Sequence, residues 1–113
     1  MINYSFIIRR ATPEDAEAIR IILQESFKKY MEDTGLVGTM EALKETEDVI
    51  RHDIETKDVF VAFIDEVPVG TVRVHLIPDG TAYISRFGVR LDYHNIGIGK
   101  SLMNLVDKVL KAK

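Results

Sequence analysis

The chain has 113 residues, a length that fits one domain built around one hydrophobic core. Hydrophobic residues make up 46% of the chain and charged residues 29%, a composition typical of a soluble globular protein and not of a disordered or membrane chain. The net charge of −3 argues against a general affinity for nucleic acid, and the absence of cysteine excludes disulfides and thiol chemistry. We therefore expect a single domain over residues 1–113 with a small-molecule partner.

The sequence contains neither a membrane-spanning run nor the pattern of a secretory signal peptide. Its longest wholly apolar run, residues 59–64, is far too short to span a bilayer. The first ten residues place their arginines after a short apolar run, which is the reverse of a secretory signal peptide. We expect a cytoplasmic protein that does not contact membranes.

The amino-terminal residues predict a strand followed by an amphipathic helix. Residues 4–11, YSFIIRRA, have the β-branched and aromatic content of a short strand. Thr12 suits the N-cap of a helix, Pro13 suits its first position, and Asp15 places a carboxylate where the helix dipole favours it. The residues that recur at helical spacing are Ala16, Ile19, Ile22, Leu23, Ser26, Phe27 and Tyr30.

The middle of the chain predicts a second helical stretch and three strands. Met40, Leu43, Ile50 and Ile54 share one side of that stretch, with an interruption expected near Thr46. The strands are expected at residues 59–64, 69–77 and 82–89, and turns of a few residues separate them. Such short connections predict antiparallel pairing.

The segment HNIGIGKS, residues 94–101, precedes a final amphipathic helix and allows two interpretations as a phosphate-binding device. Its end matches a nucleotide-binding P-loop, but that motif needs a glycine at the position of His94. A P-loop also belongs to a parallel sheet with further strand–helix units, which the short turns exclude. We therefore favour a turn in which Gly97 and Gly99 bring backbone amides close to a pyrophosphate at the start of a helix.

Residues 87–103, FGVRLDYHNIGIGKSLM, resemble the acetyl-CoA-binding motif of the GCN5-related N-acetyltransferases. That motif has a strand ending in valine, a short loop, then Gln or Arg, two residues, Gly, one residue, and Gly or Ala. Val89, His94, Gly97 and Gly99 stand at these positions, with His94 in place of the usual Gln or Arg. The order of the expected elements resembles the family over the whole chain.

The resemblance implies an α/β (α+β) fold in which helices flank a mixed, mainly antiparallel sheet, with the element order β-α-α-β-β-β-α. It implies transfer of an acetyl group from acetyl-CoA to a primary amine of a small molecule or peptide, without a metal. The residues that it assigns to the cofactor are Phe87, Gly88, Val89, His94, Asn95, Ile96, Gly97, Ile98, Gly99 and Lys100.

Three of these residues carry more specific expectations. Gly88 is expected at a β-bulge or at a close backbone approach, and in the family such a bulge opens the strand edge to pantetheine. The side chain of His94 is expected to matter less than its amide, which should join the other amides on the pyrophosphate. Lys100 either adds positive charge there or is simply solvated.

Catalytic groups are harder to assign. An alkylamine of pKa ~10.4 must lose a proton before it attacks a thioester, so a base or a water chain is required. Several family members carry a glutamate at the position of Tyr83, which makes Tyr83 the catalytic candidate through a water that its hydroxyl orients. Packing within the strand is the alternative for Tyr83, and Ser85 is a weaker candidate. The histidines show no metal-ligand spacing.

In the family, a fifth strand, another helix and a closing pair of strands follow the cofactor helix. This sequence stops at Lys113, before all of these, so we expect an incomplete domain whose C-terminal strands are missing. Such a chain should form a twofold homodimer, either by pairing the open edges of the strand at residues 81–89 or by exchanging terminal helices. The alternative to an enzyme is a non-catalytic CoA-binding or dimerisation module.

Overall fold

A computed structural model of the chain describes residues 6–35 and 40–112. Its elements follow the predicted order, and the second helical stretch is divided in two near Thr46, as expected. They are β1 (Phe6–Arg10), α1 (Ala16–Thr34), α2 (Met40–Lys44), α3 (Glu47–Thr56), β2 (Asp58–Ile64), β3 (Val67–Leu76), β4 (Ala82–Val89) and α4 (Ile98–Lys111). Short 3₁₀ turns at Pro13–Asp15 and Leu91–Tyr93 precede α1 and α4.

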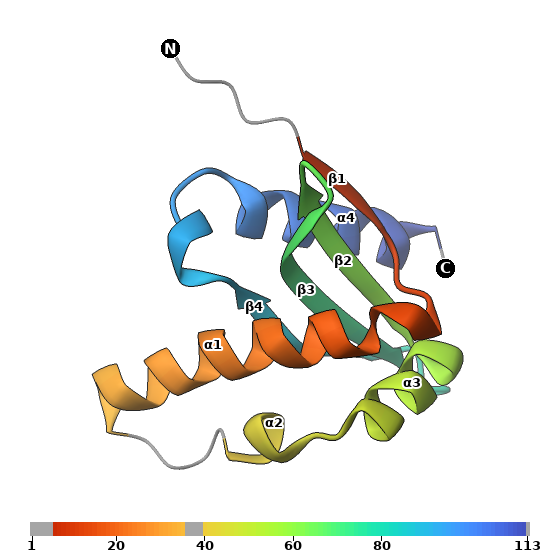
Figure 1. Cartoon of the computed structure of the whole chain (residues 1–113). Coiled ribbons are helices and arrows are strands. Elements are labelled where there is room, and N and C mark those ends of the chain that lie inside the picture. Colours follow the sequence, from red (N-terminus) through yellow and green to blue (C-terminus); the bar gives the residue numbers. More distant parts are fainter. Residues whose placement is uncertain (1–5, 36–39, 113) are drawn as a thin grey trace.

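The four strands form one antiparallel sheet in the order β1-β2-β3-β4. The two-residue turn between β2 and β3 consists of Asp65 and Glu66, whose φ angles of 48° and 70° suit the twist of a tight hairpin. Helices α1, α2 and α3 lie on one side of the sheet and α4 lies on the other (Figure 1). The predicted antiparallel pairing is confirmed.

The sheet divides the hydrophobic core into two layers, whereas the sequence led us to expect one core. The division follows from strand geometry, because successive side chains of a strand point to opposite faces. The layer under α4 contains Phe60, Ala62, Ile64, Val69, Val72, Val74, Val89, Ile98, Leu102 and Val106. The layer under α1 and α3 contains Ala16, Ile19, Ile22, Leu23, Ile50, Val59 and Val61.

The predicted start of α1 is held by side chains of the preceding turn. The carboxylate of Asp15 accepts a hydrogen bond of 2.7 Å from the amide of Thr12. The Arg9 guanidinium donates to both oxygens of the same carboxylate, at 2.7 and 3.0 Å. Asp15 therefore joins the end of β1 to the beginning of α1.

A buried ion network fixes the junction of α2 and α3 to the sheet. Arg73 of β3 is only 2% exposed and donates to Glu45 at 3.0 and 2.8 Å and to Asp53 at 2.7 Å. Glu45 also lies 3.4 Å from Nε of Arg86 on β4. Breaking such a buried pair on one side costs about 3–5 kcal/mol, so this network strongly restrains the junction.

A β-bulge interrupts the pairing of β3 and β4 directly before Gly88, the residue at which we expected either a bulge or a close approach. Thr71 pairs with Gly88 and Arg73 pairs with Ser85, so two residues of β4 face one residue of β3 between them. The bulge therefore falls on Arg86 and Phe87, and Arg86 has a φ of 51°. Of the two features expected at Gly88, the bulge therefore lies on the two preceding residues, because strand register determines which residue loses its partner.

Gly88 instead permits a close approach of α1. A Cβ at Gly88 would lie 3.0 Å from Oγ of Ser26. Gly70 on β3 has the same role on the other face, where a Cβ would lie 3.1 Å from Cγ2 of Ile98. Both distances are shorter than ordinary van der Waals contact, so a methyl group at either position would force the neighbouring side chain to shift by a few tenths of an ångström.

Candidate functional site

The loop between β4 and α4 reverses the chain and directs the start of α4 toward the end of β4. Asn95 has a φ of 66° and Gly97 a φ of 93°, so both adopt the left-handed conformation. Gly97 is the N-cap of α4, and the amide of Ser101 donates the first helical hydrogen bond to its carbonyl at 3.0 Å. Glycine suits this cap because its backbone takes a positive φ without strain.

The start of α4 presents backbone donors to its surroundings. The amides of Ile98, Gly99 and Lys100 precede the first intrahelical bond, and the helix dipole adds partial positive charge at this end. A Cβ at Gly97 would meet no atom within 4 Å, so the space beside the cap is open. These features together make an anion-binding geometry.

A groove of about 420 Å³ lies against this helix start. Its lining residues are Ser26, Phe87, Gly88, Val89, Tyr93, His94, Asn95, Gly97, Ile98, Gly99 and Lys100. The structure thus brings together all the residues that the sequence assigned to the cofactor, except Ile96, which packs against the core layer under α4.

Ser26 and Tyr93 belong to the groove although the sequence motif did not indicate them. Tyr93 lies within the loop of the motif, so its position next to His94 was a usable signal. Ser26 comes from α1, far away in the sequence, and its helical spacing indicated only that it faces the sheet. Tertiary packing of α1 on β4 places it in the groove.

The described residues that line the groove favour an anion. Lys100 carries a positive charge, and none of the lining residues carries a carboxylate. The nearby carboxylate of Glu25 is already engaged, since it accepts hydrogen bonds from Nε of Arg90 at 3.2 Å and from the amide of Leu91 at 3.1 Å. Glu25 therefore fixes the loop to α1 and does not line the groove.

We expected the backbone amide of His94 to matter more than its side chain, but the contacts of the two groups favour the side chain. Its amide donates to the carbonyl of Leu91 at 3.4 Å and is thus directed into the turn. Its imidazole Nε2 lies 2.8 Å from the carbonyl oxygen of Val89, which requires a proton on that nitrogen for a hydrogen bond. The side chain of His94, more than its amide, therefore shapes the groove.

The catalytic candidate lies outside the groove. Tyr83 pairs with His75 near the beginning of β4, and its side chain is 64% exposed. Neither Tyr83 nor Ser85 is among the residues that line the groove. The catalytic role of Tyr83 stays a prediction that this arrangement does not support.

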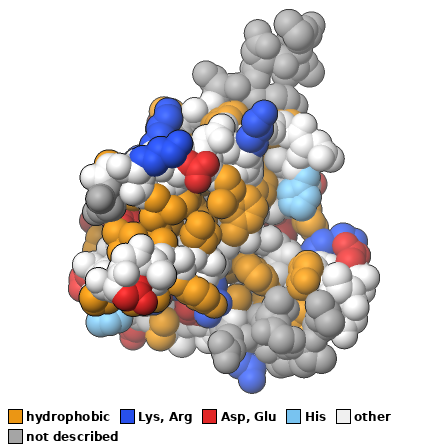
Figure 2. Space-filling model, turned by 180° about the vertical axis from the view of Figure 1, so that it is seen from behind, with side chains coloured by type: hydrophobic (Ala, Val, Ile, Leu, Met, Phe, Trp, Pro, Cys, Tyr) orange, Lys and Arg blue, Asp and Glu red, His pale blue; other side chains and the backbone are white. Residues whose placement is uncertain are grey.

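Exposed apolar side chains also occur on β4. Hydrophobic atoms gather across the middle of the face that is turned away from the viewer in Figure 1, as Figure 2 shows. On β4 itself, Tyr83, Ile84 and Phe87 are 64%, 39% and 38% exposed. Since β4 is the last strand in the sheet order, its outer edge has no strand partner among the described residues.

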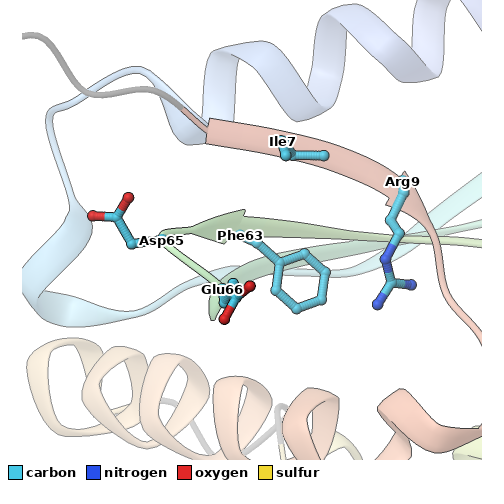
Figure 3. Close-up of a pocket in the computed structure, with 5 residues that line it drawn as sticks. All are labelled: Ile7, Arg9, Phe63, Asp65 and Glu66. Atoms are coloured by element: carbon cyan, nitrogen blue, oxygen red, sulfur yellow. The ribbon is translucent and has the colours of Figure 1, made fainter.

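A larger hollow of about 550 Å³ lies at the other edge of the sheet, lined by Ile7, Arg9, Phe63, Asp65 and Glu66 (Figure 3). The charge of Arg9 is not available there, because its guanidinium pairs with Asp15 and stacks 4.6 Å from the centre of the Phe63 ring. None of the described residues that line this hollow begins a helix, so they do not offer the donors that the groove beside α4 has. We therefore assign the functional site to the groove.

Two further findings, on metal binding and on membrane spans, apply to the described part of the chain. No group of three or more His, Cys, Asp or Glu side chains there is placed to hold a metal ion. No helix there has both the length and the apolar character that a membrane crossing requires.

Comparison with known proteins identifies the family. The chain matches the acetyltransferase (GNAT) family over residues 17–113. It belongs to the GNAT family. Among curated protein sequences, none matches the chain significantly. Family membership confirms the resemblance that the glycine motif indicated and agrees with the rejection of a P-loop.

Solved structures of GNAT enzymes share the fold. The PaiA N-acetyltransferase of Thermoplasma acidophilum, in complex with coenzyme A, has a TM-score of 0.85 and 21% identity, over 96% of this chain and 73% of that one. The ribosomal-protein-S18-alanine N-acetyltransferase of Escherichia coli has a TM-score of 0.73 and 16% identity, over 96% and 61%. N-acetylglutamate synthase of Neisseria gonorrhoeae, complexed with coenzyme A and N-acetyl-glutamate, has a TM-score of 0.73 and 14% identity, over 98% and 24%.

These likenesses establish the architecture of this GNAT chain. The antiparallel sheet with flanking helices, predicted from the sequence, is therefore confirmed as a GNAT fold. The chain spans less than two thirds of the Escherichia coli and Neisseria gonorrhoeae proteins.

Proposed function

We propose that this chain binds acetyl-CoA in the groove beside α4 and that the acetyl group is transferred to a primary amine. The observation that carries the proposal is the geometry of Gly97, a left-handed N-cap with open space beside it. A pyrophosphate at this position would satisfy the free amides at the start of α4 and would meet the positive end of the helix dipole.

The residues of the groove fit such a ligand. The amides of Ile98, Gly99 and Lys100 would hold phosphate oxygens, and the ammonium of Lys100 would add charge. Phe87 and Val89 offer apolar surface at the β4 end of the groove. The outer edge of β4 beside the bulge offers unpaired backbone groups to an amide-containing arm such as pantetheine.

An amine acceptor must be neutral to react. Deprotonating an alkylamine of pKa ~10.4 at pH 7 costs about 4–5 kcal/mol, and a carboxylate or histidine usually accepts the proton. No carboxylate is among the described residues that line the groove, and the imidazole Nε2 of His94 is engaged by Val89. The Nδ1 nitrogen of His94, which accepts a proton when Nε2 is the donor, and solvent water are therefore the proton acceptors that we propose for this groove.

A non-catalytic CoA-binding or dimerisation module is the second candidate. The position of Tyr83, exposed and outside the groove, favours this alternative because it leaves the site without the proposed catalytic side chain. The two functions differ in one measurable property, which is the release of free CoA thiol from acetyl-CoA across a panel of primary amines.

Dimer formation is proposed independently of catalysis. The outer edge of β4 carries exposed apolar residues and has no strand partner among the described residues. An edge of this kind recruits another strand. We place the interface of a twofold homodimer of the 113-residue chain at this edge.

Titration calorimetry with CoA tests the proposed site. Lys100→Gln removes a charge at the groove, and Lys111→Gln removes the same charge from the far end of the same helix. We expect the first variant to bind CoA about tenfold more weakly, a change of about 1.4 kcal/mol, and the second to bind as the parent does. Absence of heat with the parent chain, or equal affinities of the two variants, would contradict the site.

A further inference from the structure

Ser26 occupies a particular place on α1. Its Oγ lies 3.0 Å from the position that a Cβ of Gly88 would take, so the hydroxyl rests directly on β4. Gly88 follows the two bulged residues Arg86 and Phe87, where the ladder of β3 and β4 is interrupted. The hydroxyl therefore lies at the point where β4 departs from regular pairing.

Two hollows meet at this point. The groove beside α4 contains Ser26 and Phe87, and a second hollow of about 330 Å³ is lined by Ser26, Phe27, Tyr30 and Phe87. Ser26 and Phe87 are the residues that the two hollows share. A ligand whose phosphates lie at the start of α4 would extend along the groove to this junction, where the second hollow gives access from α1.

The hydroxyl of Ser26 is free to donate. Hydroxyls within helices usually bond to the carbonyl four residues earlier, as Thr34 does to Tyr30 at 2.7 Å and Thr56 does to His52 at 2.9 Å. Ser26 makes no hydrogen bond to any described residue, although its side chain is partly buried. A partly buried hydroxyl without a partner is available to a ligand.

We infer that the Ser26 hydroxyl donates a hydrogen bond to the acyl carbonyl oxygen of acetyl-CoA. The inference rests on the proposed function, because it takes the phosphates to lie at the start of α4. The chemical class of the ligand at the junction is thus a thioester, and the second hollow receives the amine.

The contact serves the transfer step. The amine nitrogen forms a bond to the carbonyl carbon and an electron pair moves onto the oxygen, where a hydrogen bond from Ser26 stabilises the developing charge. The carbonyl then re-forms, the carbon–sulfur bond breaks with its electron pair on sulfur, and the proton lost by the amine reaches the thiolate through solvent. The products are an N-acetylated amine and CoA thiol, so atoms and charge balance.

A simpler role for Ser26 would be to supply a small side chain that packs on Gly88. The Ser26→Ala variant distinguishes this packing role from donation of a hydrogen bond to the thioester. Alanine keeps the small size and is a better helix former, so the variant should fold. Ser85→Ala is the matched control, since Ser85 lies on β4 and does not line the groove. Binding of acetyl-CoA and of CoA is measured by titration calorimetry for the parent and both variants.

We expect Ser26→Ala to weaken acetyl-CoA binding about three- to tenfold, the typical effect of one lost hydrogen bond, and to leave CoA binding unchanged. Ser85→Ala should change neither. Unchanged acetyl-CoA binding by Ser26→Ala, or an equal loss for acetyl-CoA and CoA, would overturn the inference. If the parent chain binds neither ligand, the proposed function itself fails, which is a distinguishable result.

Discussion

The imidazole Nε2 of His94 lies 2.8 Å from the backbone carbonyl oxygen of Val89. The contact links the last residue of β4 to the loop that precedes α4, and thereby holds one wall of the groove. Histidine can do this as a neutral donor or as an imidazolium, because Nε2 carries a proton in both forms.

His94→Ala should therefore weaken CoA binding about three- to tenfold by releasing the loop, since one hydrogen bond contributes about 1 kcal/mol. His94→Gln retains an amide donor and should lose less affinity. Titration calorimetry of both variants checks this expectation. Equal affinity of His94→Ala and the parent would show that the loop holds its conformation without the imidazole.

The pair Gly97→Asp and Gly97→Asn isolates charge at the cap of α4. Both side chains have nearly the same size and share the strain of a φ of 93°, and both have open space around them. The Gly97→Asp variant should bind CoA about a hundredfold more weakly than the Gly97→Asn variant, because its carboxylate repels a pyrophosphate. This corresponds to a difference of about 2.7 kcal/mol in binding free energy. Thermal unfolding should show that the Gly97→Asp variant is no less stable than the Gly97→Asn variant, since a carboxylate is favourable at the start of a helix. Equal CoA affinities of the two variants would refute the phosphate position.

Asp15 should make stability depend on pH in the acid range. Burial alone would raise the pKa of Asp15, but hydrogen bonds from Arg9 and Thr12 outweigh it and hold the pKa below its usual value. A lowered pKa in the folded state means that the carboxylate stabilises the fold above about pH 4 and that this contribution is lost as pH falls through the folded pKa.

Urea unfolding of Asp15→Asn checks this dependence. The variant should be about 1 kcal/mol less stable than the parent at pH 7, and the difference should shrink as the pH is lowered below 3. Asp107→Asn, which alters an exposed side chain of α4, should show no such convergence. If the free energies of unfolding of the parent and Asp15→Asn differed by the same amount at all pH values, the lowered pKa of Asp15 would be contradicted.

The edge of β4 should determine the oligomeric state of the 113-residue chain. Ile84→Lys places a charge on this strand, where the native side chain is 39% exposed, and should convert the expected dimer into a monomer. Ile7→Lys places the same charge on the opposite edge strand, where the native side chain is 69% exposed, and should leave the dimer intact. Sedimentation at micromolar concentration measures the oligomeric state of both variants and of the parent chain. A monomeric parent chain would rule out the proposed interface at the edge of β4.

Local patterns predicted most of the elements. The stripe of Ile98, Leu102 and Val106 predicted the buried face of α4, and all three side chains are buried. The glycine spacing predicted a turn before α4, and the structure shows that Gly97 makes it with a φ of 93°, a conformation that glycine adopts without strain. Thr46 marked the division of the second helical stretch because a threonine hydroxyl readily caps a new helix, as it does toward the amide of Val49.

Features that depend on distant residues escaped prediction. The bulge at Arg86 and Phe87 arises from the register of two strands, which no single strand specifies. Glu45 meets Arg73 across 28 residues of sequence. The place of Ser26 in the groove likewise requires α1 to pack on β4, so the sequence motif alone could describe only one wall of the site.

Gly70 and Gly88 lie on neighbouring strands and face opposite sides of the sheet, one toward Ile98 and the other toward Ser26. Helices α4 and α1 approach the strands closely at these two glycines, because a hydrogen atom stands at each position where a side chain would otherwise separate helix from strand. The position of α1 against β4, and with it one wall of the groove, consequently depends on the absence of a side chain at Gly88. A methyl group at Gly88 would force Ser26 of α1 to shift by a few tenths of an ångström, and one at Gly70 would force the same shift on Ile98 at the start of α4.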